Sequence, residues 1–441
     1  MQIILLLLVS YLGWNIVKMY IPNLHKAEHL GLSFMVGMGV YALIYYILVL
    51  YQKVLPVNSS LLILVMLSVI SGLLVRLTHP IIKYYQSSPA KLTRQEIVLL
   101  TITGLILTYI ALQNWYWPPY SPDAIHLYDF RALRLLDDDI DGFFNGTKYL
   151  ASKNYPPFTS LMHYFFYTFG FVNPKNGYTI LLASFLLTLY GYTERLTGSR
   201  LKGILISTLT ILTPSVWWNS ILAMTNIPLM EYFSLAVLYL CDFKNEIGIR
   251  SSWLLSGILL GMASFIRQEA IWIPILGIGF VFGIFTRKLT KYLLMTAIFL
   301  LIANLWPISI TWTTPIAQIH TETQSVLKIT NNISTSDFNA AEIALKSLWK
   351  SWGSVIVAFY ATIMLQFFIF RNKLLTPIQL IGVMMSISIV VGFMTFSKRF
   401  TGWSGISDAV YRMGVVVIPI FWIGIITSPI WNIIFKKKNY L

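Results

Sequence analysis

Long apolar runs separated by short polar loops make up most of this 441-residue sequence. A helix needs roughly 20 apolar residues to cross a bilayer, and about thirteen runs approach that length. They begin near residues 2, 30, 60, 97, 178, 203, 227, 252, 270, 292, 353, 376 and 410. The pattern predicts an all-α polytopic membrane protein with about thirteen transmembrane helices.

Composition supports this class, because 56% hydrophobic and 11% charged residues do not suit a soluble globular protein. The net charge of +15 could suggest nucleic acid. The Lys and Arg residues lie in short loops between apolar runs, however, where they set membrane topology. We therefore expect membrane lipids as partners and no nucleic acid. Cys241 is the only cysteine, which excludes an intramolecular disulfide and a cysteine metal cluster.

Six basic loops predict the orientation, because placing all of them in the cytoplasm makes every crossing consistent. Residues 115–157, 315–350 and 397–412 then lie outside, and residues 431–441 form a basic cytoplasmic tail. The basic groups are Lys83, Lys91 and Arg94; Arg195, Arg200 and Lys202; Lys244 and Arg250; Arg287, Lys288 and Lys291; Arg371 and Lys373; and Lys436, Lys437 and Lys438.

Residues 118–156 form the predicted external loop, which is acidic in an otherwise apolar chain. In SPDAIHLYDFRALRLL, Ser121 can cap a helix and Asp123 lies in its first turn, where a carboxylate complements the helix dipole. Apolar residues share this segment with Arg131 and Arg134, as in a helix lying along the membrane surface. The acidic run at 137–141 is read as a solvated turn.

Asp123 has a second interpretation, since a carboxylate just outside a spanning helix can act as a general base at the membrane boundary. Asp129 is a further candidate in the same segment. The loop ends in YPPFTSLMHYFFYTFGFVNP, which is apolar but would break the alternation of basic loops if it crossed. We predict a re-entrant or interfacial helix there.

Four segments occur in an order that resembles the GT-C superfamily of polyprenyl-phosphate-sugar-dependent glycosyltransferases. They are WPPYSPDAIHLYDFRALRLL, YPPFTSLMHYFFYTFG, FIRQEAIWIPI and DAVYRMGVVVIPI. Protein O-mannosyltransferases and the lipid A aminoarabinose transferase belong to this superfamily. The resemblance covers residues 97 to about 425. It implies a GT-C-like catalytic transmembrane domain at 97–430 and additional transmembrane helices at 1–96.

The sequence departs from the family pattern at two places. Three extra helices precede the acidic loop, which in the family usually follows the first helix. Many relatives also carry a second external Asp where this chain has Asn226. Glu231, five residues further on, could substitute for it or could be a packing or pore residue.

The resemblance implies transfer of a sugar from a polyprenyl-phosphate carrier to a hydroxyl of a lipid, glycan or protein, with inversion and with Asp123 as general base. One carboxylate is sufficient, because the lipid phosphate leaves without a general acid once its charge is stabilised. The predicted substrate-binding residues are Arg267, Arg412, Asp129, Glu269 and Asn226.

Arg267 interrupts an apolar hairpin at its external end, where an ionisable group is costly unless it is used or paired. It could hold the phosphate or form a structural pair with Glu269. Arg412, placed at the outer start of the last helix, could bind phosphate or extend to the interface. Gly257 and Gly261, in the first arm of the hairpin, predict close helix packing.

The sequence predicts no certain cofactor. His126, His163 and His320 lack the tight spacing of a metal motif, although some relatives use a divalent metal near an external His, which leaves His320 as a candidate ligand. Two other functions remain open. A secondary transporter or lipid flippase would show paired halves and midplane charges; a polysaccharide polymerase or ligase would use a diphosphate-linked donor.

Overall fold

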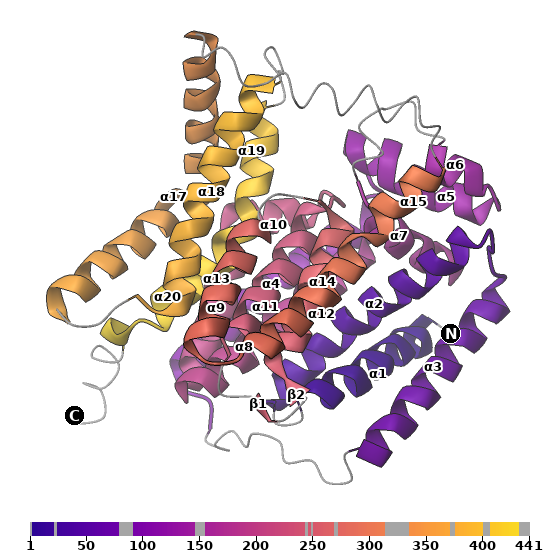
Figure 1. The fold of residues 1–441 in the computed structure, drawn as a ribbon, viewed down its shortest axis with the longest axis horizontal. Helices are drawn as coiled ribbons and strands as arrows, with labels where there is room; N and C mark the ends of the chain where they lie inside the picture. The colour runs from indigo at the N-terminus through magenta and orange to yellow at the C-terminus, as the bar shows by residue number, and fades with distance from the viewer. Residues whose placement is uncertain are drawn as a thin grey trace.

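The computed structural model describes residues 2–21, 24–78, 91–145, 155–242, 246–247, 250–268, 272–313, 335–370, 375–399 and 406–431. These residues are almost entirely helical (Figure 1). The exception is a hairpin of two short antiparallel strands, β1 (Glu246–Ile247) and β2 (Arg250–Ser251). The predicted all-α class is confirmed.

The helices fall into three groups along the chain. The first contains α1 (Gln2–Tyr20), α2 (Lys26–Leu50), α3 (Val57–Thr78) and α4 (Arg94–Tyr116). The second contains η1 (Ala124–Asp129), α5 (Phe130–Leu136), α6 (Ile140–Asn145), α7 (Phe158–Thr168), α8 (Asn176–Thr197), α9 (Arg200–Leu212), α10 (Pro214–Ser220) and α11 (Asn226–Leu240). The third contains α12 (Ser252–Ile266), α13 (Trp272–Phe285), α14 (Leu289–Ala303), α15 (Leu305–Thr313), α17 (Thr335–Ile369), α18 (Pro377–Arg399), α19 (Ile406–Gly414), η4 (Val415–Val417) and α20 (Ile418–Ile426).

Seven segments of the described chain are long and apolar enough to cross a membrane: 2–20, 26–50, 57–77, 94–116, 289–309, 342–369 and 407–426. Four shorter apolar helices occur at 226–240, 252–266, 275–285 and 377–392. The protein is therefore an integral membrane protein. Each predicted run contains a helix, but several helices are shorter than a full span, so the count of thirteen spans is not confirmed.

The predicted external loop at 315–350 is partly helical, because α17 already begins at Thr335. Gly353 interrupts α17 with a non-helical conformation, whose φ of 48° lies in the left-handed region that favours glycine. The apolar run that starts near residue 353 therefore corresponds to the second half of α17, beyond this break. Sequence hydropathy missed the first half because its residues are mixed polar and apolar.

Helices α12 and α14 approach closely at the two glycines of α12. A Cβ atom added at Gly257 would lie 2.6 Å from the carbonyl oxygen of Met295, and one at Gly261 would lie 2.8 Å from Cβ of Ile302. The prediction that these glycines allow close helix packing is confirmed.

A buried ion network ties the N-terminal helices to the rest of the bundle. Arg195 of α8 donates to both carboxylate oxygens of Glu28 in α2, at 2.8 and 2.7 Å, and to Asp242 at 2.7 Å. Its side chain is only 9% exposed. Tyr239 of α11 also donates to Glu28, at 2.7 Å. The helices of residues 1–96 therefore pack into the common core, and the domain boundary at residue 96 stays a prediction.

The predicted external loop carries η1, α5 and α6, which confirms that it contains juxtamembrane helices. In Figure 1, α5, α6 and α19 lie toward the upper edge of the bundle and the β1–β2 hairpin lies at the lower edge. Helix α7 has 11 residues, a length of roughly 16 Å at 1.5 Å per residue. This is about half of the bilayer core, which agrees with a segment that does not cross.

Arg131 departs from the surface-helix prediction. Its side chain is fully buried, donates to the backbone oxygen of Tyr155 at 2.8 Å and lies over the Trp306 ring at 5.2 Å. Burial lowers the pKa of Arg131 to about 10. Of the two arginines in this segment, only Arg134 remains substantially exposed, with 42% of its side chain accessible.

Candidate functional site

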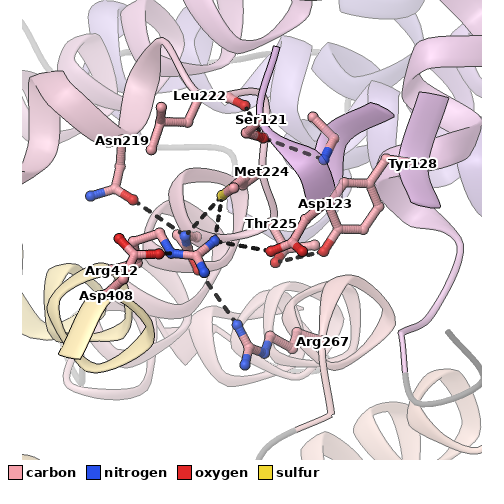
Figure 2. A network of polar contacts seen from close by, with 12 residues as sticks. Ser121, Asp123, Tyr128, Asn219, Leu222, Met224, Thr225, Arg267, Asp408 and Arg412 are labelled. Carbon is pink, nitrogen blue, oxygen red and sulfur yellow. Dashed lines mark hydrogen bonds and ion pairs between the residues drawn. The ribbon is translucent and has the colours of Figure 1, made fainter. Parts of the chain in front are cut away.

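Asp123 lies at the start of a helical segment that Ser121 caps. The Ser121 hydroxyl accepts from the backbone N–H of Ala124 at 3.3 Å and donates to the backbone oxygen of Leu222 at 3.1 Å. The predicted cap is therefore present and is made by Ser121. The Asp123 side chain makes no cap hydrogen bond, is 53% exposed and points toward Arg412 (Figure 2).

Arg412 stands between two carboxylates. Its Nη1 atom lies 3.1 Å from Oδ2 of Asp123, and its Nε atom lies 2.9 Å from Oδ2 of Asp408. The side chain is 17% exposed. Arg412 lies in the last turn of α19 and near the start of the final apolar span at 407–426, which agrees with its predicted place at the start of the last helix.

Arg267 follows the last residue of α12 and faces Asn226, the first residue of α11. Its Nη1 atom donates to the Asn226 side-chain oxygen over a long 3.5 Å, and its guanidinium lies 5.3 Å from the centre of the Tyr155 ring. The Asn226 amide donates in turn to the side chain of Asn219 at 3.2 Å. Glu269 lies outside the described residues.

The turn between α10 and α11 joins these pairs into one network. Ala223, at its centre, has a φ of 56°, a left-handed conformation that costs a non-glycine residue roughly 1–2 kcal/mol. Met224 contacts the Arg412 guanidinium through its sulfur, and Thr225 accepts a hydrogen bond from Tyr128 of η1 at 3.3 Å. Strained turns of this kind cluster at functional sites.

The network combines groups of two chemical kinds. Arg267 and Arg412 offer planar N–H donors that suit phosphate oxygens. Asp123 offers an exposed carboxylate that can take up a proton. Their supporting elements come from four separate parts of the chain, namely η1, the α10–α11 turn, the end of α12, and α19 (Figure 2).

Asp129 and Glu231 lie away from this network. The Oδ1 atom of Asp129 accepts from the Tyr167 hydroxyl at 2.8 Å and lies 3.0 Å from Nδ1 of His163. Glu231 is fully buried, and its carboxylate has no hydrogen-bond partner among the described residues. Glu231 follows Asn226 by five positions, which turns it about 140° around α11, so it points elsewhere.

Sequence reasoning did not single out Asp408, Asn219, Tyr155 or Tyr128. The pairing of Asp408 with Arg412 could have been predicted, because the two residues are four positions apart on a helix, the spacing at which opposite charges meet. The other three contact the site through tertiary packing, for which a single sequence gives no signal.

The described residues contain no group of three or more His, Cys, Asp or Glu side chains arranged to hold a metal ion. His163 is buried between Asp129 and Tyr178, and His126 is exposed on η1. The candidate ligand His320 lies outside the described residues.

No protein-family model and no curated protein sequence matches this chain. Its fold is similar to that of ArnT from Cupriavidus metallidurans in the apo state, with a TM-score of 0.52 and 12% sequence identity, over 78% of this chain and 62% of ArnT. The structure of the same protein bound to undecaprenyl phosphate gives a TM-score of 0.50 and 15% identity, over 75% of this chain and 60% of ArnT.

The similarity shows that this chain shares its fold with ArnT. This confirms at the level of the fold the resemblance found in the sequence. The matched region spans about three fifths of the length of ArnT.

Proposed function

We propose that this protein is a GT-C glycosyltransferase that moves a sugar from a polyprenyl-phosphate carrier to a hydroxyl group of a lipid, glycan or protein. The observation that supports this most is the direct pairing of exposed Asp123 with Arg412, in a network that includes Arg267. A proton acceptor and two phosphate-binding groups thus meet at one place in a GT-C fold.

The reaction needs one bond to break and one to form at the anomeric carbon. The bond from this carbon to the phosphate oxygen breaks, and its electron pair leaves with the lipid phosphate. The acceptor oxygen attacks the opposite face of the sugar, which inverts the anomeric configuration. Asp123 takes the proton that the acceptor hydroxyl loses.

Arg412 and Arg267 act on the leaving phosphate. Negative charge grows on the phosphate oxygens as the bond breaks, and fixed guanidinium groups stabilise that charge without reorganising. In the structure, Asp123 and Asp408 hold the Arg412 side chain. Donor binding would place the phosphate beside Arg412 and release the Asp123 carboxylate for the acceptor.

The proposed site lies on the extracytoplasmic side of the membrane. Support comes from the basic loops, one of which contains the β1–β2 hairpin at the lower edge in Figure 1, opposite α5, α6 and α19. The positive-inside rule places such basic loops in the cytoplasm. The C-terminal tail, whose residues 432–441 lie outside the described chain, is proposed to be cytoplasmic on the same ground.

Binding of undecaprenyl phosphate to the purified protein tests this proposal before the sugar is known. We expect native mass spectrometry in detergent to show a complex with the wild-type protein and with Lys346→Ala, which removes an exposed cation of α17. Arg412→Ala and Arg267→Ala should bind at least about tenfold more weakly. Equal binding by all four proteins would contradict the proposal.

A further inference from the structure

His163 of α7 is a fully buried histidine whose two ring nitrogens are both engaged. Nδ1 lies 3.0 Å from Oδ1 of Asp129, and Nε2 lies 3.1 Å from the Tyr178 hydroxyl. Tyr167 lies one helical turn further along α7 and donates to the same Asp129 oxygen at 2.8 Å. Two side chains of α7 therefore hold one carboxylate of the external loop.

Asp129 is the last residue of η1, a π-helical segment that starts directly after Asp123. π-Helical turns are rare and occur frequently at functional sites. Their hydrogen bonds close a wider ring than those of an α-helix, so the directions of the first and last side chains depend on which turn forms. Contacts from elsewhere in the fold must keep such a turn in place.

The start of the turn and its far end are held by different elements. Ser121 fixes the start to the α10–α11 turn through Leu222. Asp129 fixes the far end to α7, and its side chain is only 14% exposed. If the far end were released, η1 could relax to an α-helix and the Asp123 carboxylate would change direction.

We propose that His163 is a positioning residue, which anchors Asp129 and so maintains the π-helical turn that presents Asp123 to Arg412. This inference rests on the proposed function, in which Asp123 is the general base. It assigns Asp129 to holding the loop, in place of the substrate contact expected from the sequence.

A buried proton relay through Asp129 and His163 is a weaker explanation of the same contacts. The Asp123 side chain is 53% exposed and can exchange its proton with water directly. The geometry also suits the tautomer in which Nδ1–H donates to Asp129 and Nε2 accepts from the Tyr178 hydroxyl. This tautomer is inferred from the hydrogen-bond network.

Two amide substitutions of His163 separate its two contacts. The amide nitrogen of Asn occupies nearly the position of Nδ1, so His163→Asn retains a donor toward Asp129. The amide nitrogen of Gln occupies nearly the position of Nε2, so His163→Gln retains only the contact with Tyr178. Tyr178→Phe removes that second contact alone and serves as the control.

Hydrogen–deuterium exchange of the purified protein measures the anchoring without any substrate. We expect His163→Gln to accelerate exchange in residues 121–136, while His163→Asn and Tyr178→Phe leave this segment as in the wild type. Tyr167→Phe removes the other donor to Asp129 and should give an intermediate increase in exchange. If His163→Gln does not fold, Tyr167→Phe takes its place in the experiment. Unchanged exchange in the folded variant would overturn the anchoring.

Turnover then tests whether the anchoring positions Asp123. With the undecaprenyl-phosphate-linked sugar that the wild type uses fastest from a panel, His163→Gln should lower kcat by about 10²-fold, with donor KM within about twofold. His163→Asn should recover most of kcat. Equal kcat in the two variants would overturn the inference, whereas full activity of Asp123→Asn would overturn the proposed function and leave the exchange result standing.

Discussion

The guanidinium of Arg412 lies 3.1 Å from the carboxylate of Asp123, although 289 positions separate the two residues in the chain. The pair joins the predicted external loop at 118–156 to the last apolar span. It also places the proposed base against a proposed phosphate ligand. Because the Asp123 side chain is half exposed, water screens the pair and a bound phosphate can separate it.

Arg412 and Asp408 should differ sharply in their effect on donor binding. Arg412→Ala removes a charged donor to phosphate, which is worth roughly 1.5–3 kcal/mol, so undecaprenyl phosphate affinity should fall by about tenfold or more. Asp408→Asn weakens only an i,i+4 pair whose acid is exposed, worth about 0.3–0.5 kcal/mol, and should change affinity by about twofold. Similar losses in both variants, measured by titration in detergent, would contradict this division.

Asn226→Asp should weaken donor binding. The new carboxylate would lie beside Arg267, whose Nη1 atom is 3.5 Å from the Asn226 oxygen, and would compete with phosphate. We expect undecaprenyl phosphate affinity to fall by about two- to fivefold. Asn226→Ser removes the amide without adding charge and is the control. Tighter binding by the Asp variant would show that Arg267 does not contact phosphate.

Several parts of the site were predictable because they depend on local sequence. The Ser121 cap follows from residue type and spacing, and the cost of an intramembrane cation drew attention to Arg267. The contacts of Asp129 with α7 could not be predicted, because a sequence does not show which helices become neighbours.

Arg195→Ala should be strongly destabilising. It would leave Glu28 and Asp242 buried without their cation, and breaking a buried ion pair costs about 3–5 kcal/mol. We expect a clear fall in Tm in detergent, measured against Arg76→Ala at the exposed end of α3. A Tm equal to that of the control would contradict the role of the network in joining α2 to α8.

Lys175 should make the free energy of unfolding depend on pH. Its side chain is 1% exposed, its Nζ atom lies 4.9 Å from the Tyr120 ring centre, and burial lowers its pKa to about 8. Between this value and the usual lysine pKa of about 10.4, the unfolded chain binds more protons than the folded one. The contribution of Lys175 to stability therefore rises with pH in that range.

Replacement of Lys175 tests this sign directly. We expect Lys175→Met to unfold at a higher temperature than the wild type at pH 7, because the buried charge is gone. The difference should shrink as the pH rises from 8 to 10. Lys346→Met, at an exposed position, should show no such trend. If the difference in Tm between Lys175→Met and the wild type stayed constant with pH, the pKa of Lys175 would not be lowered.

Neither the topology of the bundle nor its buried ion networks could be predicted from the sequence, and the reason is the same for both. Apolar runs predict where helices form, and basic loops predict which ends share a side. Neither shows that Arg195 and Arg200, expected only to set topology, pair with the carboxylates of Glu28 and Glu96. Arg131 is a similar case, since its buried position depends on contacts with Tyr155 and Trp306.

The central claim is that Asp123 is the general base of sugar transfer. The most direct measurement compares turnover of an undecaprenyl-phosphate-linked sugar by the wild type, Asp123→Asn and Asp137→Asn, an exposed acid of the same loop. We predict that Asp123→Asn loses about 10²–10⁴-fold in kcat while it still binds undecaprenyl phosphate, and that Asp137→Asn stays active. Turnover by Asp123→Asn close to that of the wild type would contradict the account.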